Sequence, residues 1–547
     1  MTDEVPQAQR FAPDPAPPCP SPARRSTILA MATALLALGT GSAMAQDVTV
    51  RAVMHSALRI LDPIASSASI TRNHGYMVFD TLVGVDENYV PRPQMADWEV
   101  SDDGLSYTFT LRDGLTWHDG APVTAADCVA SLRRWAEYDT GGQMLMGYVA
   151  DIEALDDASF VIRLSAPFGY LIDILAKPSS VPALMMPERI ADIPFGEQIA
   201  EQIGSGPFTF AADEFQPGVQ VVYEKFEGYV PRDEAPSGTA GGKAVNVDRV
   251  EWINMSDPQT AMNALLSGDI DYIERAPIDL LPLLETDPAI TTAVLDPLGM
   301  QVIGRMNFLH APFDDPAIRR AALMAVSQAD VLAALIGNPD YYEVCGAIFG
   351  CGTPLASDAG AESLIAGGSV EDARAALEAA GYDGTPVVIL QPTDVATLSP
   401  QPLILADALR RAGFNVQLDP MDWQTLVSRR ANQGPPAEGG WNLFVTNGGV
   451  DALWNPVINF LLGATGTEGG WFGWPTDPAL EEMRIAFATA ATEEERVSLA
   501  SEIQAHVLDQ VIMIPLGQFN NVSAWRDSVT DLLESPVPAF WHMRATE

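Results

Sequence analysis

The segment from Trp441 to Trp474 is well suited to holding a ligand, because it combines tryptophans with glycines and amides. Large aromatic side chains offer a surface for stacking, while amides and exposed backbone can hydrogen-bond polar atoms. This composition favours a cleft that wraps an extended ligand; the alternative is an irregular loop packed on its own aromatic residues. The candidate contact residues in it are Asn447, Trp454, Trp471 and Trp474.

Catalytic motifs are missing from the sequence. Neither G-x-S-x-G nor H-E-x-x-H occurs. The glycines near Gly204 and Lys243 do not form G-x-x-x-x-G-K-[ST], so a phosphate-binding loop is not expected. We therefore expect no catalytic residue, no cofactor and no metal site, and a secreted hydrolase would need a triad assembled only in space. The histidines are scattered along the chain: His55, His74, His118, His310, His506 and His542.

Two of the four cysteines lie close together in the run CGAIFGC. Cys345 and Cys351 are spaced for a small disulfide loop in an oxidising compartment. A metal site at this pair is the alternative, but no second cysteine pair or histidine cluster lies nearby in the sequence. Cys128 would then be a lone buried thiol.

The chain is strongly acidic, with a formal net charge of −42. A surface of this sign repels nucleic acid, so nucleic acid is excluded as a partner. The charge could attract cationic ligands, although a well-solvated acidic surface explains it equally directly.

The amino-terminal residues carry an export pattern. Arg24-Arg25 precede an apolar run from Thr27 to Leu38, and Ala43-Met44-Ala45 matches an A-x-A cleavage site. Residues 1–45 are thus predicted to be a signal peptide with an overlong first part, or with a start codon placed too early. General secretion is favoured over the twin-arginine route because Thr27 stands where a large apolar residue is usual. No cysteine follows the run, so a lipoprotein is not expected.

Regular elements follow at recognisable boundaries. Alternation from Leu105 to Leu111 predicts a half-buried strand, a short strand is expected at Leu115 and Trp117, and Thr124 with Asp127 predicts a capped helix start. Further along we expect a flexible loop at 236–243, a strand at 269–273, a helix from Pro316 to Gly337 and a strand at 511–515.

Several blocks resemble one family. The stretch FTLRDGLTWHDGAPVTAADCVASLRR, the GSGPF run at Gly204, the block VDRVEWINMSDPQTAMNALLSGDIDYIE and the run RMNF with PFDDPAIRRA are similar to the extracellular solute-binding proteins of ABC importers, family 5, the peptide/nickel/opine class. The resemblance implies an α/β fold of the periplasmic binding protein class II type with an extra lobe, in which two main lobes are joined by a hinge around a ligand cleft. The implied division is lobe I at 46–82, 203–300 and 515–547, lobe II at 83–202, and lobe III at 301–514.

The resemblance also implies site residues. Peptide binders of this class carry an aspartate that pairs with the ligand's α-ammonium group, and Asp451 occupies that place here. The upstream arginine and tryptophan of some oligopeptide binders are Val445 and Gly448 in this chain, and Asn455 replaces a common acidic residue. The helix that carries His74 and Tyr76 begins near the cleft in these proteins, which makes both residues candidate contacts.

The function implied is that of a periplasmic subunit that captures a small solute, a short peptide in our interpretation, by hinge closure. It would deliver the solute to permease subunits driven by a cytoplasmic ATPase, perform no chemistry and act as a monomer. The alternative cargoes on the same scaffold are a nickel chelate, haem, an opine, a sugar or an antibiotic. A chaperone role without a saturable ligand is a further alternative.

Overall fold

The structure is a computed structural model that describes residues 48–395, 397–490 and 492–546. The predicted signal peptide at 1–45 lies outside the described residues. The remainder, Asp47–Glu547, forms one compact unit. Within the described part of the chain, no helix is long and apolar enough to cross a membrane.

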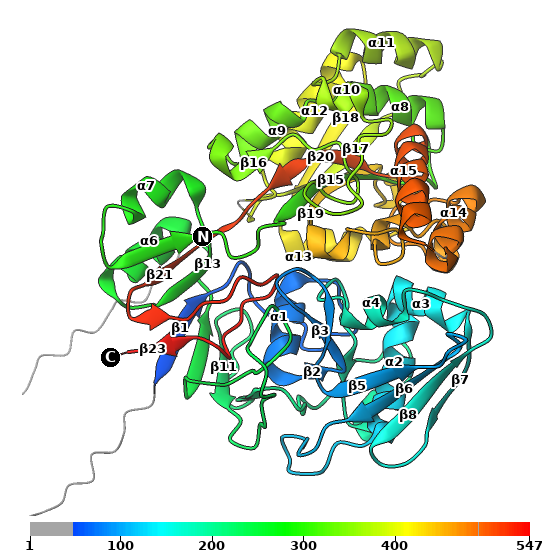
Figure 1. The fold of residues 1–547 in the computed structure, drawn as a ribbon. Helices are drawn as coiled ribbons and strands as arrows, with labels where there is room; N and C mark the ends of the chain where they lie inside the picture. The colour runs from blue at the N-terminus through cyan, green and yellow to red at the C-terminus, as the bar shows by residue number, and fades with distance from the viewer. Residues whose placement is uncertain (1–47, 396, 491, 547) are drawn as a thin grey trace, which may run out of the picture. The chain divides into compact units, whose positions relative to one another are not determined.

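A seven-stranded mixed sheet gathers strands from both ends and the middle of the chain (Figure 1). Its first strand runs parallel to two neighbours, with Thr49 opposite Arg249 and Ala52 opposite Tyr272. Asp257 caps the helix that follows the third strand, and Gly268 ends that helix in the left-handed conformation. In spatial order the strands are β10 (Phe208–Phe210), β11 (Gln220–Lys225), β12 (Arg249–Ile253), β1 (Thr49–Val53), β13 (Tyr272–Ala276), β21 (Val522–Arg526) and β14 (Ile290–Ala293), with the helices α1 (Ser69–Val78), α6 (Pro258–Ser267) and α7 (Leu281–Leu284).

A four-stranded antiparallel sheet contains the strand predicted from the alternating residues Leu105 to Leu111. Tyr107, Phe109 and Leu111 are buried, as the alternation predicts. Thr124 and Asp127 form both halves of a capping box at the start of α2. The elements are β5 (Ala96–Val100), β6 (Ser106–Leu111), β8 (Ser159–Leu164), β7 (Val149–Ala154), α2 (Ala125–Tyr138), α3 (Thr140–Met146), α4 (Leu171–Ala176) and α5 (Glu188–Ala191).

A six-stranded mixed sheet forms the centre of the third group of elements. Helices of this group pack on the sheet and on one another, and α14 and α15 pair together. The strands in order are β16 (Tyr342–Glu343), β20 (Ile514–Phe519), β15 (Met300–Met306), β19 (Leu443–Gly449), β17 (Val387–Pro392) and β18 (Val416–Met421). The helices are α8 (Pro316–Met324), α9 (Gln328–Leu335), α10 (Glu362–Ile365), α11 (Val370–Ala379), α12 (Gln401–Ala412), α13 (Trp423–Arg429), α14 (Pro478–Thr489) and α15 (Glu493–Gln510).

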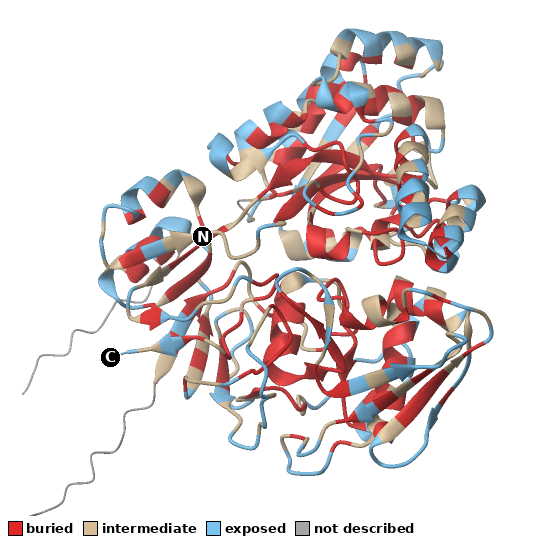
Figure 2. Ribbon diagram, viewed as in Figure 1, coloured by how far each residue is buried: buried red, intermediate tan, exposed pale blue. Residues whose placement is uncertain are grey.

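Figure 2 shows that the central strands are buried, whereas α11, α14 and α15 expose much of their surface.

Short elements complete the fold. The short strands pair as β2 (Asp80–Thr81) with β9 (Leu184–Met185), β3 (Val83–Val85) with β4 (Pro91–Pro93), and β22 (Val529–Thr530) with β23 (Arg544–Ala545). The 3-10 turns are Ile278–Leu280, Pro339–Tyr341, Pro436–Glu438, Val450–Ala452, Phe460–Leu462 and Gly466–Glu468.

The GSGPF run holds the chain against the end of α1. A Cβ at Gly204 would lie 2.0 Å from the Val78 carbonyl oxygen, and the Gly206 amide donates to the same oxygen at 2.9 Å. His118 completes the junction, since its Nε2 lies 3.1 Å from the Gly206 carbonyl oxygen. These glycines therefore serve close backbone packing.

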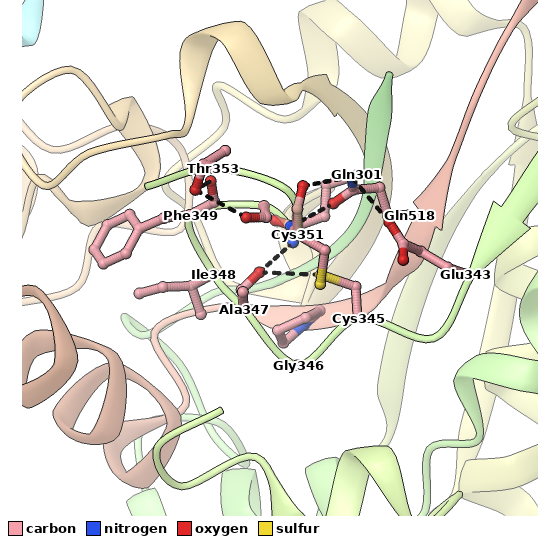
Figure 3. The surroundings of a disulfide bond; sticks show 12 residues. Gln301, Glu343, Cys345, Gly346, Ala347, Ile348, Phe349, Cys351, Thr353 and Gln518 are labelled. Atoms are coloured by element: carbon pink, nitrogen blue, oxygen red, sulfur yellow. Dashed lines mark hydrogen bonds between the residues drawn. A yellow bond between two sulfur atoms is a disulfide. The ribbon is translucent and has the colours of Figure 1, made fainter. Parts of the chain in front are cut away.

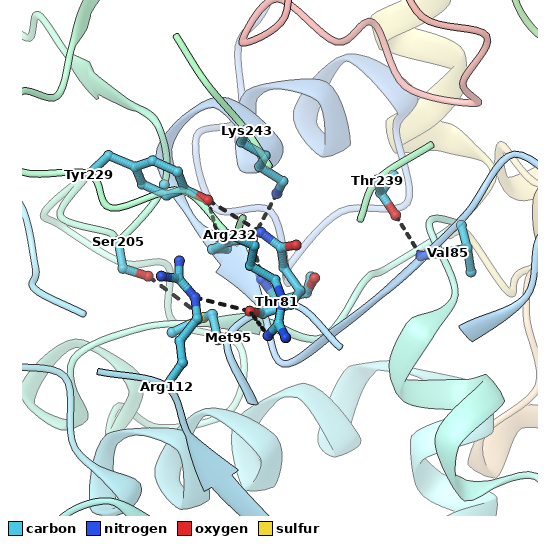
Figure 4. Close-up of polar contacts among 12 residues, drawn as sticks. Thr81, Val85, Met95, Arg112, Ser205, Tyr229, Arg232, Thr239 and Lys243 are labelled. Carbon is cyan, nitrogen blue, oxygen red and sulfur yellow. Dashed lines mark hydrogen bonds and ion pairs between the residues drawn. The ribbon is translucent and has the colours of Figure 1, made fainter. Parts of the chain in front are cut away.

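The loop predicted at 236–243 is present, but the expectation that it is flexible is wrong, because residues 238–243 are buried. Lys243 Nζ reaches Asp80 Oδ1 at 2.7 Å, and both side chains are fully buried. Tyr229 donates its hydroxyl to the same carboxylate at 2.9 Å. Thr239 accepts from the Val85 amide at 2.9 Å (Figure 4). A buried ion pair and a backbone contact thus order a segment that its composition marks as a loop.

Three strand or helix predictions also need correction. The helix from Pro316 ends at Met324, because Ser327 accepts from the Asp330 amide and starts a second helix, α9. The strand expected at 511–515 begins at Ile514, since Val511 ends α15 in the left-handed conformation with φ 51°. The strand expected at 269–273 begins at Tyr272.

The strand expected around Leu115 and Trp117 is likewise reduced to a single bridge between Thr116 and Pro122.

The run CGAIFGC forms a disulfide loop between Cys345 and Cys351, whose Cα atoms lie 5.9 Å apart. The Gln518 side chain accepts from the Cys351 amide at 2.9 Å and donates to the Cys351 carbonyl at 3.1 Å (Figure 3). Gln301 donates to the Ala347 carbonyl at 2.7 Å. Buried glutamines therefore satisfy the backbone of this irregular loop, as buried polar groups require.

Candidate functional site

Two adjacent cavities lie between elements of the seven-stranded and six-stranded sheets. The larger cavity contains about 1080 Å³ of empty space and the smaller about 590 Å³, part of each being continuous with solvent. They share Ser69, Arg275 and Met300 in their walls. A ligand could therefore occupy both.

The larger cavity is built from loops at the ends of strands. The chain after β1 contributes Arg59, the start of α1 contributes Ser69, and the opposite wall includes Asn447 and Trp471. Asn447 is already engaged, because its Oδ1 accepts from Gln401 at 2.7 Å and its Nδ2 donates to the Thr397 carbonyl at 3.1 Å. Trp471 presents its ring beside Phe460, with the ring centroids 5.0 Å apart.

The smaller cavity holds Asp451, whose carboxylate is 1 % exposed. Arg72 Nη1 donates to Asp451 Oδ2 at 3.1 Å, and Arg72 Nη2 donates to the Pro536 carbonyl at 2.9 Å. Gly449 makes room for this arrangement, because a Cβ there would lie 2.1 Å from Asp451 Oδ1. Burial raises the pKa of Asp451, although the Arg72 charge opposes that shift.

Asp296 is the second acidic group of this cavity wall. Burial, reinforced by the charge of Asp451, raises the pKa of Asp296 to about 7. Its Oδ1 accepts from the Tyr89 hydroxyl at 3.1 Å. Because its pKa lies near neutrality, a nearby cation would favour its ionised form.

Glu274 lies beside these residues on β13 and is fully partnered. It accepts from His55 Nδ1 at 2.7 Å, from the His55 amide at 2.8 Å and from Asn73 at 3.1 Å. Burial raises the pKa of Glu274, but the charge of His55 and these hydrogen bonds outweigh burial and hold it at about 2.

The remaining predicted contacts lie elsewhere. His74 is fully buried, and burial lowers its pKa to about 4. Its Nδ1 lies 2.9 Å from the Tyr223 hydroxyl, and its Nε2 lies 3.1 Å from Gln202 Oε1. Tyr76 is buried beside Lys243. Trp474 packs near Trp441. Trp454 is half-buried against the main core. None of these four is among the described residues that line the two cavities.

Sequence reasoning missed Arg72, Glu274, Arg275, Asp296 and Arg430. One available signal was position, because β1 and β13 run parallel and the carboxyl ends of parallel strands gather ligand groups. Glu274 and Arg275 lie at that end of β13. The chain offers no comparable local signal for Arg430.

A metal centre has no support in the described residues, because no three histidine, cysteine, aspartate or glutamate side chains gather there as ligands. The free cysteine of that part, Cys128, is buried, and burial raises its pKa above the usual range.

Comparison with known proteins identifies the family. The model of bacterial extracellular solute-binding proteins, family 5, matches residues 90–470. This chain belongs to that family. It is 43% identical over 506 residues to a probable peptide ABC transporter periplasmic-binding protein of Sinorhizobium fredii, covering 92% of this chain and 94% of the relative.

Solved structures of family 5 binding proteins share the fold. The DppA binding protein of Helicobacter pylori in complex with the peptide STSA has a TM-score of 0.76 at 17% identity, covering 91% of this chain and 98% of that chain. The AgaA binding protein of A. tumefacien R10 in complex with agropinic acid has a TM-score of 0.75 at 21% identity, covering 91% and 99%.

The family and the α/β binding-protein fold expected from the sequence are confirmed. The chain is a solute-binding protein of the extracellular or periplasmic compartment. Because this family consists of binding proteins and not enzymes, the hydrolase alternative is set aside.

Proposed function

We propose that this chain is the periplasmic capture subunit of an ABC importer, that its ligand is a short peptide, and that it passes the peptide to membrane permease subunits. The observation that carries the proposal is the pair of adjacent cavities between two sheets, which share wall residues, with acidic side chains in the smaller cavity. The relative at 43% identity, named as a probable peptide-binding subunit, supports the same cargo.

The peptide's amino group would lie in the smaller cavity near Asp451 and Asp296. That cavity lining contains three carboxylates, Asp451, Asp296 and Glu274, against the two guanidinium groups of Arg72 and Arg275. An added ammonium group would balance the excess acid, and charge-assisted hydrogen bonds to a carboxylate are strong in such surroundings. The aromatic ring of Trp471 would then contact the remainder of the peptide, which extends into the larger cavity beside Asn447.

The chain would act by closing its lobes. It enters the seven-stranded sheet at β1, leaves for the six-stranded sheet at β15 and returns at β21, so two segments of the described chain connect these two sheets. A ligand that contacts both sides would favour the closed arrangement over the open one, and the permease would recognise the closed form. The lobe boundaries at 83, 203, 301 and 515, and a monomeric state, belong to this proposal.

Export is part of the proposed function. Residues 1–45 would direct the chain across the cytoplasmic membrane and be removed, leaving a protein without a lipid anchor in the periplasm. The disulfide between Cys345 and Cys351 suits that oxidising compartment.

The test is a binding measurement with tri-alanine and N-acetyl-tri-alanine by isothermal titration calorimetry. We expect the free-amine peptide to bind and its acetylated form to bind about 10- to 100-fold more weakly, since a hydrogen bond to a charged group contributes about 1.5–3 kcal/mol. Asp451→Asn should remove most of that difference.

The matched control is Asp119→Asn, at a carboxylate paired with Arg189 and outside the cavity walls. It should keep the preference for the free amine. Equal affinity of wild-type protein for the free and acetylated peptides would overturn the role of Asp451, and this comparison does not depend on any variant folding.

A further inference from the structure

The larger cavity is lined by three arginines and, among the described residues, by no aspartate or glutamate. Arg59 follows β1, Arg275 lies on β13 and Arg430 follows α13. The whole chain has 72 Asp and Glu against 30 Lys and Arg, so a cationic cavity runs against its composition. Three separate segments bring these charges to one cavity.

Arg430 is buried and has no anionic partner within the described part of the chain. The residue is 9% exposed, and its Nε has no hydrogen-bond partner there. The guanidinium lies over the rings of Phe472 at 4.5 Å and Trp471 at 5.4 Å. Burial lowers the pKa of Arg430 to about 10, which still leaves it protonated at neutral pH. Holding a cation there costs free energy that a bound anion would offset.

Arg429, the residue before Arg430, differs from it in being paired within the fold. Arg429 Nη1 lies 2.6 Å from Asp419 Oδ2, and Arg429 Nε donates to the Gly439 carbonyl at 2.9 Å. Arg429 is not among the described lining residues of either cavity. One arginine is therefore paired within the fold and the next faces the cavity.

Arg275 lies where the two cavities meet. The adjacent carboxylate of Glu274 is occupied by His55 and Asn73. Considering only residues that the structure describes, the Arg275 guanidinium forms no hydrogen bond or ion pair. It can therefore donate to a ligand from the shared wall.

Other polar groups of the larger cavity are also donors. Trp471 Nε1 is buried and has no partner among the described residues. The N-cap residue of α1, Ala68, makes no side-chain cap hydrogen bond to the first amides of that helix, and Ala68 and Ser69 line the cavity. Donors and positive charge together suit carboxylate oxygens.

We infer that the larger cavity selects an acidic ligand, a short peptide that carries side-chain carboxylates in addition to its terminal one, held by Arg430 and Arg275. This inference rests on the proposed peptide-binding function and specifies its substrate class. The ligand would be bipolar, with its amino group at the acidic cavity and its carboxylates at the arginine-lined cavity.

The test uses three peptides that differ in charge, Ala-Glu-Glu, Ala-Gln-Gln and Ala-Lys-Lys, with citrate as an acidic compound that is not a peptide. We expect Ala-Glu-Glu to bind about 10-fold or more tightly than Ala-Gln-Gln and Ala-Lys-Lys to bind most weakly. Arg430→Gln should weaken Ala-Glu-Glu by at least about 10-fold and change Ala-Gln-Gln by less than about threefold. Arg429→Gln is the matched control and should leave the ratio unchanged.

Arg275→Gln gives a second measurement if Arg430→Gln fails to fold, and the preference of wild-type protein needs no variant. Equal binding of the acidic and amide peptides would overturn the inference while leaving the peptide function in place. If citrate bound in an Arg430-dependent way and no peptide bound, the result would support an acidic ligand and overturn the proposed peptide-binding function. No binding of any of the four compounds would overturn both.

Discussion

The buried charges around Asp80 and those around the cavities differ in how completely they are partnered. At Asp80, the Lys243 ammonium, the Tyr229 hydroxyl and the Gln94 amide all contact one carboxylate. At the larger cavity, Arg430 and Arg275 lack a carboxylate partner among the described residues. A buried charge that the fold pairs cannot lose its partner without destabilising the fold, whereas a charge that the fold leaves unpaired beside a cavity is available to a ligand.

The largest effect expected from this comparison is on stability. Lys243→Met would leave Asp80 buried without its cation and remove the contact of Lys243 with the Trp541 ring at 4.9 Å. We expect a loss of about 3–5 kcal/mol in the free energy of unfolding, measured by urea denaturation.

The control is Lys225→Met, which removes an ion pair to the exposed Glu227 and should cost less than about 1 kcal/mol. Similar losses in the free energy of unfolding for Lys243→Met and Lys225→Met would show that the pairing of Lys243 with Asp80 does not stabilise this region.

The next-largest effect is the loss of stability at acidic pH. Burial lowers the pKa of His74 to about 4, against 6.5 when unfolded. Below pH 6.5 the unfolded chain binds a proton that the folded chain does not, so this group's contribution to stability falls from pH 6.5 to about 4 and then levels. The loss can reach about 3 kcal/mol. Denaturation series in urea between pH 7.5 and 4.5 should show the decline.

His74→Gln should flatten part of that decline, whereas His310→Gln, at a ring whose Nε2 lies 2.8 Å from the Gln433 carbonyl oxygen near the surface, serves as the control. An unchanged pH slope in His74→Gln would contradict the assignment.

The smallest effect concerns the acidic cavity. The pKa of Asp296 is raised to about 7 by burial and by Asp451, so this carboxyl group loses its proton as the pH rises through neutrality. An extra negative charge would attract the ligand's ammonium group. We expect the affinity for tri-alanine to rise about threefold between pH 6 and 7.5 by titration calorimetry, a change of about 0.7 kcal/mol.

Asp296→Asn should give a flat profile over the same range. A wild-type affinity that falls with rising pH would contradict this role for Asp296.

Much of the fold could be predicted because its signals are local. Thr124 and Asp127 cap a helix by their own spacing, and the alternation from Tyr107 to Leu111 follows from the geometry of a strand with one buried face. Predictions failed where distant residues decided the outcome. The segment at 236–243 is ordered by Asp80, which lies far away in the sequence.

The site was predicted only in part for the same reason. Asp451, Asn447 and Trp471 line the cavities, and all come from the aromatic segment that its composition identified. His74 and Tyr76 share a helix whose first turn faces the larger cavity, but their own side chains are buried in the core. Their positions depend on helix rotation against neighbouring elements, which local spacing does not specify.

By itself the sequence determined the family, the α/β class and the region that carries much of the site, because these depend on motifs and on patterns within short stretches. Only the tertiary structure decided which charges are paired. Asp451 pairs with Arg72, which is 379 positions away in the sequence. Arg429 is paired with Asp419, whereas its neighbour Arg430 has no anionic partner among the described residues. Whether a charge is satisfied depends on the groups within a few ångströms in space, and the chain assembles those groups from distant segments.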